Sequence, residues 1–273
     1  MDPRPIGVFD SGVGGLTVFR ALAAALPGEA LVYLGDTARV PYGPKSPLTV
    51  RRYAREASRF LQRKGVKMMV VACNTVSSVA MEAMEENAGV PVLGVILPGA
   101  RRAVEASGSG RIGVIGTRAT VASEAYTRAI HALSPRAEVV SRACPLFVPL
   151  AEEGWTDNAV ARQVAETYLA PLRDARVDTL VLGCTHYPLL RDVLQETMGP
   201  EVALVDSAES VALEVRARLA DDRRLAHGPD PGAPPRFFVT DAPGPFADIA
   251  QRFLGQTVDD LAHVELEAAG AVP

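Results

Sequence analysis

Val70-Val71-Ala72-Cys73-Asn74-Thr75 has a counterpart in Val181-Leu182-Gly183-Cys184-Thr185-His186, and the predicted fold rests on this pair of stretches. In each stretch, an apolar run typical of a buried strand ends at a cysteine. In open α/β sheets the carboxyl end of a strand is where ligands bind. We therefore expect the two thiols to reach one site from the two halves of the chain.

The similarity between the halves extends beyond the cysteines. Ile6-Gly7-Val8-Phe9-Asp10-Ser11-Gly12 resembles Ile112-Gly113-Val114-Ile115-Gly116-Thr117, and the two lie at similar distances before their cysteines. The repeated unit is longer than the repeats of solenoid proteins, which have about 20–50 residues. The pattern predicts two copies of one α/β unit that face each other across a central cleft.

Apolar runs predict four strands in each half. They are continuous rather than alternating, as in strands that are covered on both faces. The predicted strands are 6–10, 30–35, 68–72, 92–95, 112–116, 137–141, 179–183 and 203–205. Helical patterns follow at 16–25, 47–64, 76–87, 121–132, 158–173, 187–198 and 208–219. This alternation predicts an α/β protein with two mostly parallel sheets flanked by helices.

The segment after Ser207 has a different character. It offers a helix at 208–219, a loop rich in proline and glycine at 228–235, and then strand, helix and strand at 237–240, 246–254 and 263–266. This tail is too short to form a domain of its own, so we expect it to pack on the first half. The predicted domains are residues 1–97 plus 208–273, and residues 98–207.

Composition excludes several classes of protein. The chain has 28 Lys and Arg against 32 Asp and Glu, a net charge of −4, which offers no basic surface for nucleic acid or anionic lipid. No segment of secretory type and no apolar run of about 18 residues is found. Three widely spaced cysteines do not form a disulfide framework. We expect a cytoplasmic protein with reduced thiols.

The two repeated cysteines are candidate proton carriers. A thiol removes a proton as the thiolate, and the amino terminus of a helix lowers a thiol pKa. Cys73 and Cys184 both precede polar residues and a predicted helix, so we expect a lowered pKa for both. A cysteine can also be only a small buried hydrophobe. That interpretation fits Cys144, which lacks a polar follower and a helix start.

The loop Asp10-Ser11-Gly12-Val13-Gly14-Gly15 lets backbone amides approach an anion. Glycines also suit any tight turn from strand to helix. Thr17 stands at the third glycine position of the dinucleotide fingerprint, so only Asp36, at the end of the second strand, supports a nucleotide site. Asp10 is either a carboxylate beside the cleft or the cap of the next helix.

Three further features are candidates near the cleft. His186 can pair with a thiolate because imidazole titrates near neutrality, or it can bond only to backbone. Glu152, with Glu153, is a functional carboxylate or one of a solvated pair, and the turn Pro41-Tyr42-Gly43 lines the cleft or only reverses the chain. Four scattered histidines without a Cys-x-x-Cys motif predict no metal site. No lysine has a setting that suggests a pyridoxal Schiff base.

Together these motifs resemble those of the bacterial glutamate racemases. The similarity is carried by residues 10–15, 41–43, 72–75 and Gly183-Cys184-Thr185-His186-Tyr187-Pro188, and it extends to a closing His263-Val264-Glu265-Leu266. It implies a racemase without cofactor or metal that interconverts L- and D-glutamate and supplies D-glutamate for peptidoglycan. A homodimer is also expected.

The resemblance implies roles for individual residues. Cys184 would take the α-proton from L-glutamate and Cys73 that from D-glutamate. Asp10 and His186 match residues that assist Cys73 and Cys184 respectively, and Glu152 matches a carboxylate near the histidine. The positions implied for substrate binding are Asp10, Ser11, Pro41, Tyr42, Gly43, Cys73, Asn74, Thr75, Thr117, Thr120, Thr185 and His186.

Two alternatives remain. Racemases of aspartate or hydantoins share the two-cysteine layout, although aspartate enzymes often carry a glutamate where His186 stands here. A two-lobed binding protein for a small ligand would share the cleft and the repeat, but it would not need thiols at both strand ends.

Overall fold

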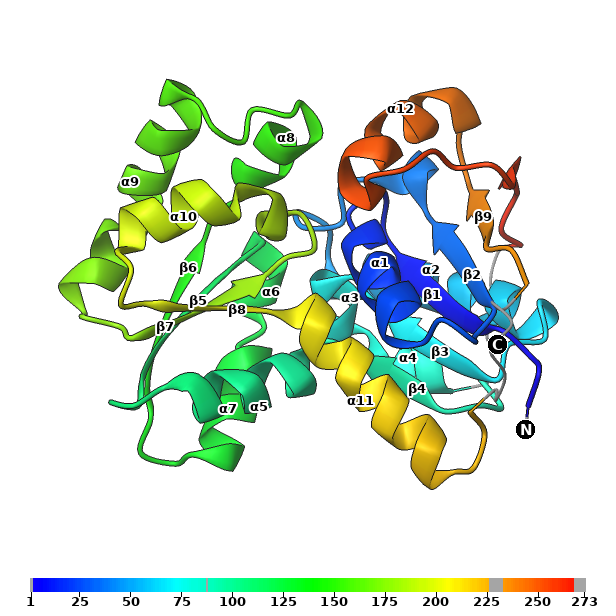
Figure 1. The fold of residues 1–273 in the computed structure, drawn as a ribbon, viewed down its shortest axis with the longest axis horizontal. Helices are drawn as coiled ribbons and strands as arrows, with labels where there is room; N and C mark the ends of the chain where they lie inside the picture. Colours follow the sequence, from blue (N-terminus) through cyan, green and yellow to red (C-terminus); the bar gives the residue numbers. More distant parts are fainter. Residues whose placement is uncertain (1, 87, 226–232, 268–273) are drawn as a thin grey trace.

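The structure, a computed structural model, describes residues 2–86, 88–225 and 233–267, which form two bodies side by side (Figure 1). One sheet has six strands in the order β10-β9-β2-β1-β3-β4, and the other has four in the order β6-β5-β7-β8. We call the bodies around these sheets the first and the second lobe. Every strand pair is parallel. The predicted fold class is confirmed.

The two sheets repeat one topology. The order β2-β1-β3-β4 in the first lobe matches β6-β5-β7-β8 in the second. The strands of the repeat are β1 (Ile6–Asp10), β2 (Leu31–Gly35), β3 (Met68–Val71), β4 (Val92–Gly94), β5 (Arg111–Gly116), β6 (Glu138–Ala143), β7 (Thr179–Gly183) and β8 (Ala203–Asp206). Since β1 and β3 correspond to β5 and β7, the two cysteine-bearing stretches take equivalent places.

The C-terminal segment extends the first sheet. β9 (Arg236–Val239) pairs with β2, and β10 (Leu261–His263) pairs with β9. The other elements around this sheet are α1 (Leu16–Ala25), η1 (Thr37–Arg39), α2 (Pro47–Arg63), α3 (Asn74–Val79), α4 (Met81–Glu85) and α12 (Pro243–Leu254). Strands β1, β2 and β3 are buried along their whole length, as their continuous apolar sequences predict.

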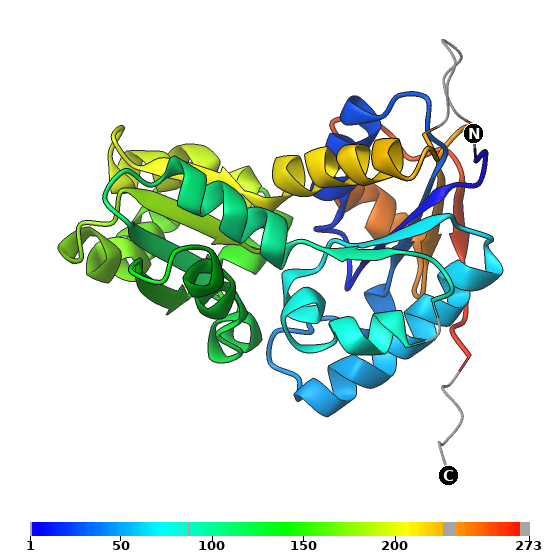
Figure 2. The same cartoon turned by 90° about the horizontal axis from the view of Figure 1, so that it is seen from below.

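The second lobe carries most of the remaining helices. They are α5 (Ile96–Ala106), α6 (Arg118–Ala122), α7 (Ala125–Leu133), α8 (Phe147–Glu152), α9 (Ala159–Asp174), η2 (Tyr187–Leu190) and α10 (Arg191–Met198). The long helix α11 (Ser207–Asp221) leaves the end of β8 and runs along the first lobe, where it packs on α1 (Figure 2). Within the described ranges, no helix is long and apolar enough to cross a membrane.

Several predicted elements differ from the structure. The predicted helices 76–87 and 121–132 are each broken into two, at Ala80 and at Glu124, whose φ is 54°. The predicted helix 187–198 begins instead with the 3₁₀ segment η2, and α10 starts at Arg191. Helices α5 and α8 were not predicted, since prolines stand within them. The last strand begins at Leu261 rather than 263. The predicted loop 228–235 and the end of helix 76–87 fall partly outside the described residues.

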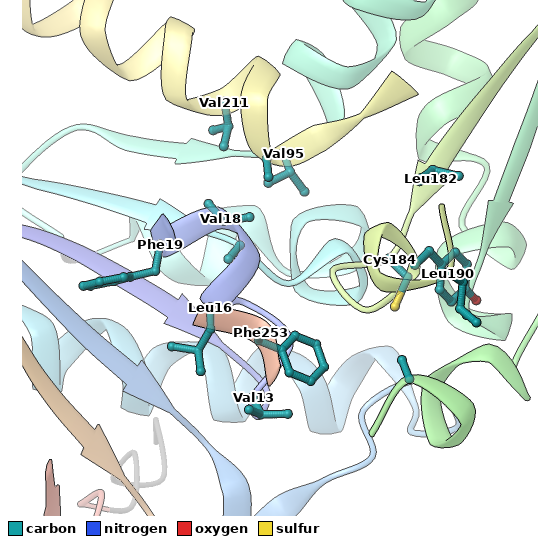
Figure 3. Close-up of a cluster of buried hydrophobic side chains, with 14 of the residues drawn as sticks. Val13, Leu16, Val18, Phe19, Val95, Leu182, Cys184, Leu190, Val211 and Phe253 are labelled. Atoms are coloured by element: carbon teal, nitrogen blue, oxygen red, sulfur yellow. The ribbon is translucent and has the colours of Figure 1, made fainter. Parts of the chain in front are cut away.

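One apolar cluster joins the two lobes. On the first-lobe side it contains Val13, Leu16 and Phe253, and on the second-lobe side Leu182 and Leu190 (Figure 3). The chain also passes between the sheets twice, at the start of α5 and at the start of α11. These two helices pack against each other and share an ion pair between Arg101 and Glu214.

Candidate active site

A cavity of about 440 Å³ lies between the carboxyl ends of strands from both lobes. Its walls come from the segments that follow β1, β2 and β3 in the first lobe and β5, β6 and β7 in the second. The lining includes most of the predicted site residues, namely Ser11, Pro41, Tyr42, Gly43, Cys73, Asn74, Thr75, Thr117, Glu152, Cys184, Thr185 and His186. Asp10 and Thr120 stand outside this lining.

The structure brings both predicted thiols to the cavity. Cys73 follows β3, Cys184 follows β7, and each is 6% exposed. Cys144 is buried in the apolar cluster and does not line the cavity. The three cysteines are free. Two equivalent strand ends thus present one thiol each to the same space, from opposite lobes.

Cys73 is surrounded differently from what its sequence suggests. Its sulfur donates a hydrogen bond to the Ser11 hydroxyl at 3.4 Å, and it stands at the N-cap of α3. Burial, followed by the nearby charge of Asp10, raises the pKa of Cys73 to about 12. The expected lowering is therefore wrong for Cys73, because desolvation outweighs the hydrogen bonds with Ser11 and the Val76 backbone, which lower the pKa.

Asp10 supports the loop that carries Ser11. It is fully buried, and its Oδ2 accepts the backbone N–H of Gly12 at 2.9 Å. Among the described residues, Oδ1 has no hydrogen-bond partner. Burial raises the pKa of this carboxyl, and the charge of His186 opposes the shift. Gly15 occupies the N-cap position of α1, and Asp10 binds the backbone of the loop before it.

Cys184 shares its surroundings with an imidazole and a carboxylate. The Cys184 sulfur lies 3.8 Å from His186 Nδ1, and His186 Nε2 lies 2.9 Å from Glu152 Oε1. Burial opposes the charged ring, but the hydrogen bonds to Cys184 and Glu152 raise the pKa of His186 to about 10. The interpretations of His186 as a mere backbone partner and of Glu152 as a solvated residue therefore do not describe these side chains.

The predicted helix start after Cys184 is not an α-helix terminus. The short 3₁₀ segment η2 begins at Tyr187, and α10 begins only at Arg191. The polar partner of Cys184 is thus the His186–Glu152 pair. Elements of the first lobe help to hold this pair: the Phe253 ring packs edge-on against the His186 ring, and Arg252 donates to the backbone carbonyl of Glu152.

A chain of hydroxyl groups crosses between the lobes at the cavity wall. Thr75 Oγ1 lies 2.9 Å from Thr117 Oγ1, which lies 3.0 Å from Thr120 Oγ1. Thr75 belongs to the first lobe and the other two to the second. Thr120 is buried and contacts the cavity only through Thr117. These hydroxyls can rotate to donate to an anion bound beside them.

The Asp36 carboxylate is occupied by protein groups. It accepts hydrogen bonds from Tyr42, from Arg39 at 2.7 Å and from Thr240 at 2.8 Å. Asp36 is fully buried and does not line the cavity. Its role is to hold the turn with Tyr42, so the structure gives no support to a ribose-binding acid.

Gly14 is a site residue that sequence reasoning missed. A Cβ atom there would lie 2.3 Å from Thr185 Oγ1 and 2.4 Å from His186 Nδ1. Beside it, the Thr17 hydroxyl donates to the Thr185 carbonyl at 3.1 Å. The glycine-rich loop therefore lets the first lobe touch the Cys184 segment directly. The glycines indicated a tight turn or an anion site, but the sequence pattern alone could not show that Gly14 contacts a histidine of the other repeat.

Other wall residues also went unpredicted. They are Gly12, Val40, Pro44, Arg118, Pro145, Val148 and Pro149. Most are small or apolar, which suits a cavity that shields reacting groups from water. Arg118 is an exposed cation that follows Thr117 on the wall. Over the described ranges, no group of three or more His, Cys, Asp and Glu side chains could hold a metal ion.

Known proteins are similar to this chain over almost its whole length. The family model described as Asp/Glu/Hydantoin racemase matches residues 6–215. A glutamate racemase of Geobacter metallireducens is 56% identical, over 97% of this chain and 98% of that protein.

Two solved structures are also similar. The glutamate racemase isoform RacE1 of Bacillus anthracis has a TM-score of 0.92 and 41% identity, over 96% of this chain and 98% of that one. The glutamate racemase of Francisella tularensis, solved in complex with D-glutamate, has a TM-score of 0.91 and 37% identity, over 98% and 99%. The resemblance found in the motifs is confirmed, and the chain belongs to the Asp/Glu/Hydantoin racemase family.

Proposed function

We propose that this protein is a glutamate racemase that interconverts L- and D-glutamate by two cysteine bases, without an organic cofactor or a metal. The observation that carries the proposal is the pair of thiols from opposite lobes in one cavity. Inverting a carbon requires a proton to leave one face and another to arrive on the opposite face. The similar proteins named glutamate racemase and the D-glutamate complex among them support the choice of substrate.

The two thiols have unlike partners, and this supports a direction for each. With L-glutamate, Cys184 takes the α-proton as a thiolate. The charged His186 ring, 3.8 Å from the Cys184 sulfur, stabilises that thiolate. The electron pair of the broken C–H bond stays on the substrate. Cys73, whose pKa is raised to about 12, is a protonated thiol that gives its proton to the opposite face. D-glutamate reacts by the reverse steps.

The cavity wall suits the charge that develops in this reaction. Removing the α-proton builds negative charge beside the substrate carboxylate, and preorganised donors stabilise such charge. Donors are available from the hydroxyls of Ser11, Thr75, Thr117 and Thr185 and from the amide of Asn74. In this proposal Asp10 assists Cys73, with which it interacts electrostatically, and Glu152 orients His186.

The choice of glutamate over aspartate or a hydantoin rests on two observations. His186 occupies the position where aspartate racemases often carry a glutamate, and the similar curated proteins are named glutamate racemase. A binding protein would need no proton carriers on both sides of its ligand, so the paired thiols favour an enzyme.

The wider setting forms part of the same proposal. We propose that the D-glutamate supplies peptidoglycan synthesis in the cytoplasm and that the protein is a homodimer, which light scattering would test. We also propose the domains 1–97 plus 208–273, and 98–207. The pairing of β9 with β2 supports the discontinuous first domain.

The proposal is tested by circular dichroism of L-glutamate, and separately of L-aspartate, incubated with the pure protein. We expect the glutamate signal to decay to zero and the aspartate signal to persist. Activity should survive dialysis against EDTA and hydroxylamine. Loss that pyridoxal phosphate restores would overturn the cofactor-free mechanism, and a preference for aspartate would overturn the substrate.

A further inference from the structure

Tyr126, which the mechanism above does not use, joins the second lobe to Asn74 on the cavity wall. It lies on α7 in the second lobe and is 2% exposed. Its hydroxyl donates a hydrogen bond of 2.7 Å to Oδ1 of Asn74, which belongs to the first lobe and follows Cys73 directly. Burial raises the pKa of Tyr126, so the hydroxyl keeps its proton and remains a donor.

Two glycines, Gly99 and Gly183, pack closely against the Tyr126 ring. A Cβ atom at Gly99 would lie 3.2 Å from ring atom Cε1, and one at Gly183 would lie 3.1 Å from Cε2. Gly99 belongs to α5, and Gly183 ends β7 immediately before Cys184. The ring is therefore fixed against the strand that carries Cys184, while its hydroxyl reaches the residue beside Cys73.

The bond from Tyr126 determines which end of the Asn74 amide remains available. Asn74 is 2% exposed and lines the cavity. Its Oδ1 accepts from Tyr126, whereas its Nδ2, among the residues that the structure describes, has no hydrogen-bond partner. A buried donor without a partner is costly unless a ligand satisfies it. The carboxylates of glutamate are acceptors of the required kind.

We propose that Tyr126 is a positioning residue, which orients the Asn74 amide so that its Nδ2 donates to a carboxylate of the substrate. This inference rests on the proposed racemase activity. Without the hydroxyl, Oδ1 loses its partner and the amide can rotate, so that an oxygen faces the carboxylate and repels it. Tyr126 would thus act on substrate affinity through Asn74, with little effect on the thiols themselves.

Tyr126→Phe tests this inference because the ring and its packing remain. We expect KM for both enantiomers to rise about tenfold and kcat to stay within about threefold, since the lost interaction holds the bound substrate. Tyr187→Phe is the matched control: Tyr187 is also buried, its hydroxyl donates at 2.8 Å to the Cys144 carbonyl, and neither residue lines the cavity. We expect its KM to stay within about twofold of wild type.

A double-mutant cycle shows whether Tyr126 acts through Asn74. In an Asn74→Ala background, Tyr126→Phe should have almost no further effect on KM, because the group that it positions is gone. Asn74→Ser is measured in parallel in case the alanine variant does not fold. Independent, multiplicative effects on KM, or an unchanged KM in Tyr126→Phe, would overturn the inference. An inactive wild-type protein would instead overturn the proposed function.

Discussion

The Cys73 side and the Cys184 side of the cavity are built from equivalent strands, yet they treat their thiols differently. Cys73 faces the Ser11 hydroxyl and the charge of Asp10, and its pKa is raised to about 12. Cys184 faces His186, whose pKa is raised to about 10. The repeated fold thus sets where each thiol lies, while residues that differ between the two repeats, such as Asp10 and His186, set its polar surroundings.

This difference makes the cavity asymmetric before substrate arrives. A thiol on one side and a sulfur beside an imidazolium on the other suit L-glutamate, and the opposite arrangement suits D-glutamate. The two directions therefore begin from different protonation states of one enzyme. Variants that alter one side only test whether the two sides differ in this way.

The largest effect is expected from the thiols themselves. Cys73→Ala and Cys184→Ala should each reduce racemisation by about 10³-fold or more, because a single base cannot return a proton to the opposite face. Circular dichroism of each enantiomer measures the loss. Cys144→Ala is the control, since its sulfur lies in the apolar cluster, and it should keep turnover within a few-fold. Full activity in either of the first two variants would refute the two-base arrangement.

The second-largest loss of activity is expected from Gly14→Ala. The new methyl group would overlap His186 Nδ1 and Thr185 Oγ1 and displace the Cys184 side. Since displacements of about 1 Å can reduce rates about 10²-fold, we expect a loss of that order in kcat/KM. Gly244→Ala is the matched control, because no atom lies within 4 Å of a Cβ at that position. Equal activities of the two variants would show that the contact between the lobes at Gly14 is dispensable.

His186→Asn should separate the two directions of the reaction. Because it impairs Cys184 as a base, we expect kcat from L-glutamate to fall about tenfold or more, and kcat from D-glutamate to fall less. The equilibrium constant requires kcat/KM to fall equally in both directions. Primary deuterium isotope effects from the two enantiomers should therefore diverge from wild type. If the isotope effects from both enantiomers are unchanged, His186 does not assist Cys184.

The smallest effect concerns stability against pH. The folded-state pKa of His186 is raised from 6.5 to about 10, so its contribution to stability is complete below pH 6.5 and is lost as the pH rises through 10. Glu152→Gln removes part of this shift. The difference in free energy of unfolding between wild type and Glu152→Gln should be larger at pH 7 than at pH 10.5, as urea titrations can measure. A gap independent of pH would contradict a charged His186 in the folded state.

Much of this site could be predicted because its residues stand in the repeated stretches of sequence. The ends of β1, β3, β5 and β7 follow from continuous apolar runs, and parallel sheets place such ends at one edge. Cys73, Cys184 and the polar residues beside them therefore reach the cavity as expected. Local sequence was sufficient wherever one strand and the loop after it determine the position.

The rest depends on contacts between distant parts of the chain. The raised pKa of Cys73 comes from burial and from Asp10, which local helix geometry does not reveal. Gly14 touches His186 from the other repeat, and Tyr126 reaches Asn74 over 52 positions of sequence. Helix α5 was missed because Pro98 and Gly99 look like a turn, although proline is tolerated in the first turn of a helix.

The double passage of the chain between the sheets limits how the cavity can open. A single linker would leave two bodies free to rotate about three axes. Here α5 and α11 leave the first and second sheets respectively and pack side by side, so twisting and sliding would strain two crossings at once. We therefore expect bending about the line that joins the crossings to be the easiest motion between the lobes. The two thiols would then move apart along one arc when the cavity opens. Each closure would bring the two sulfurs back into the same alignment with one carbon.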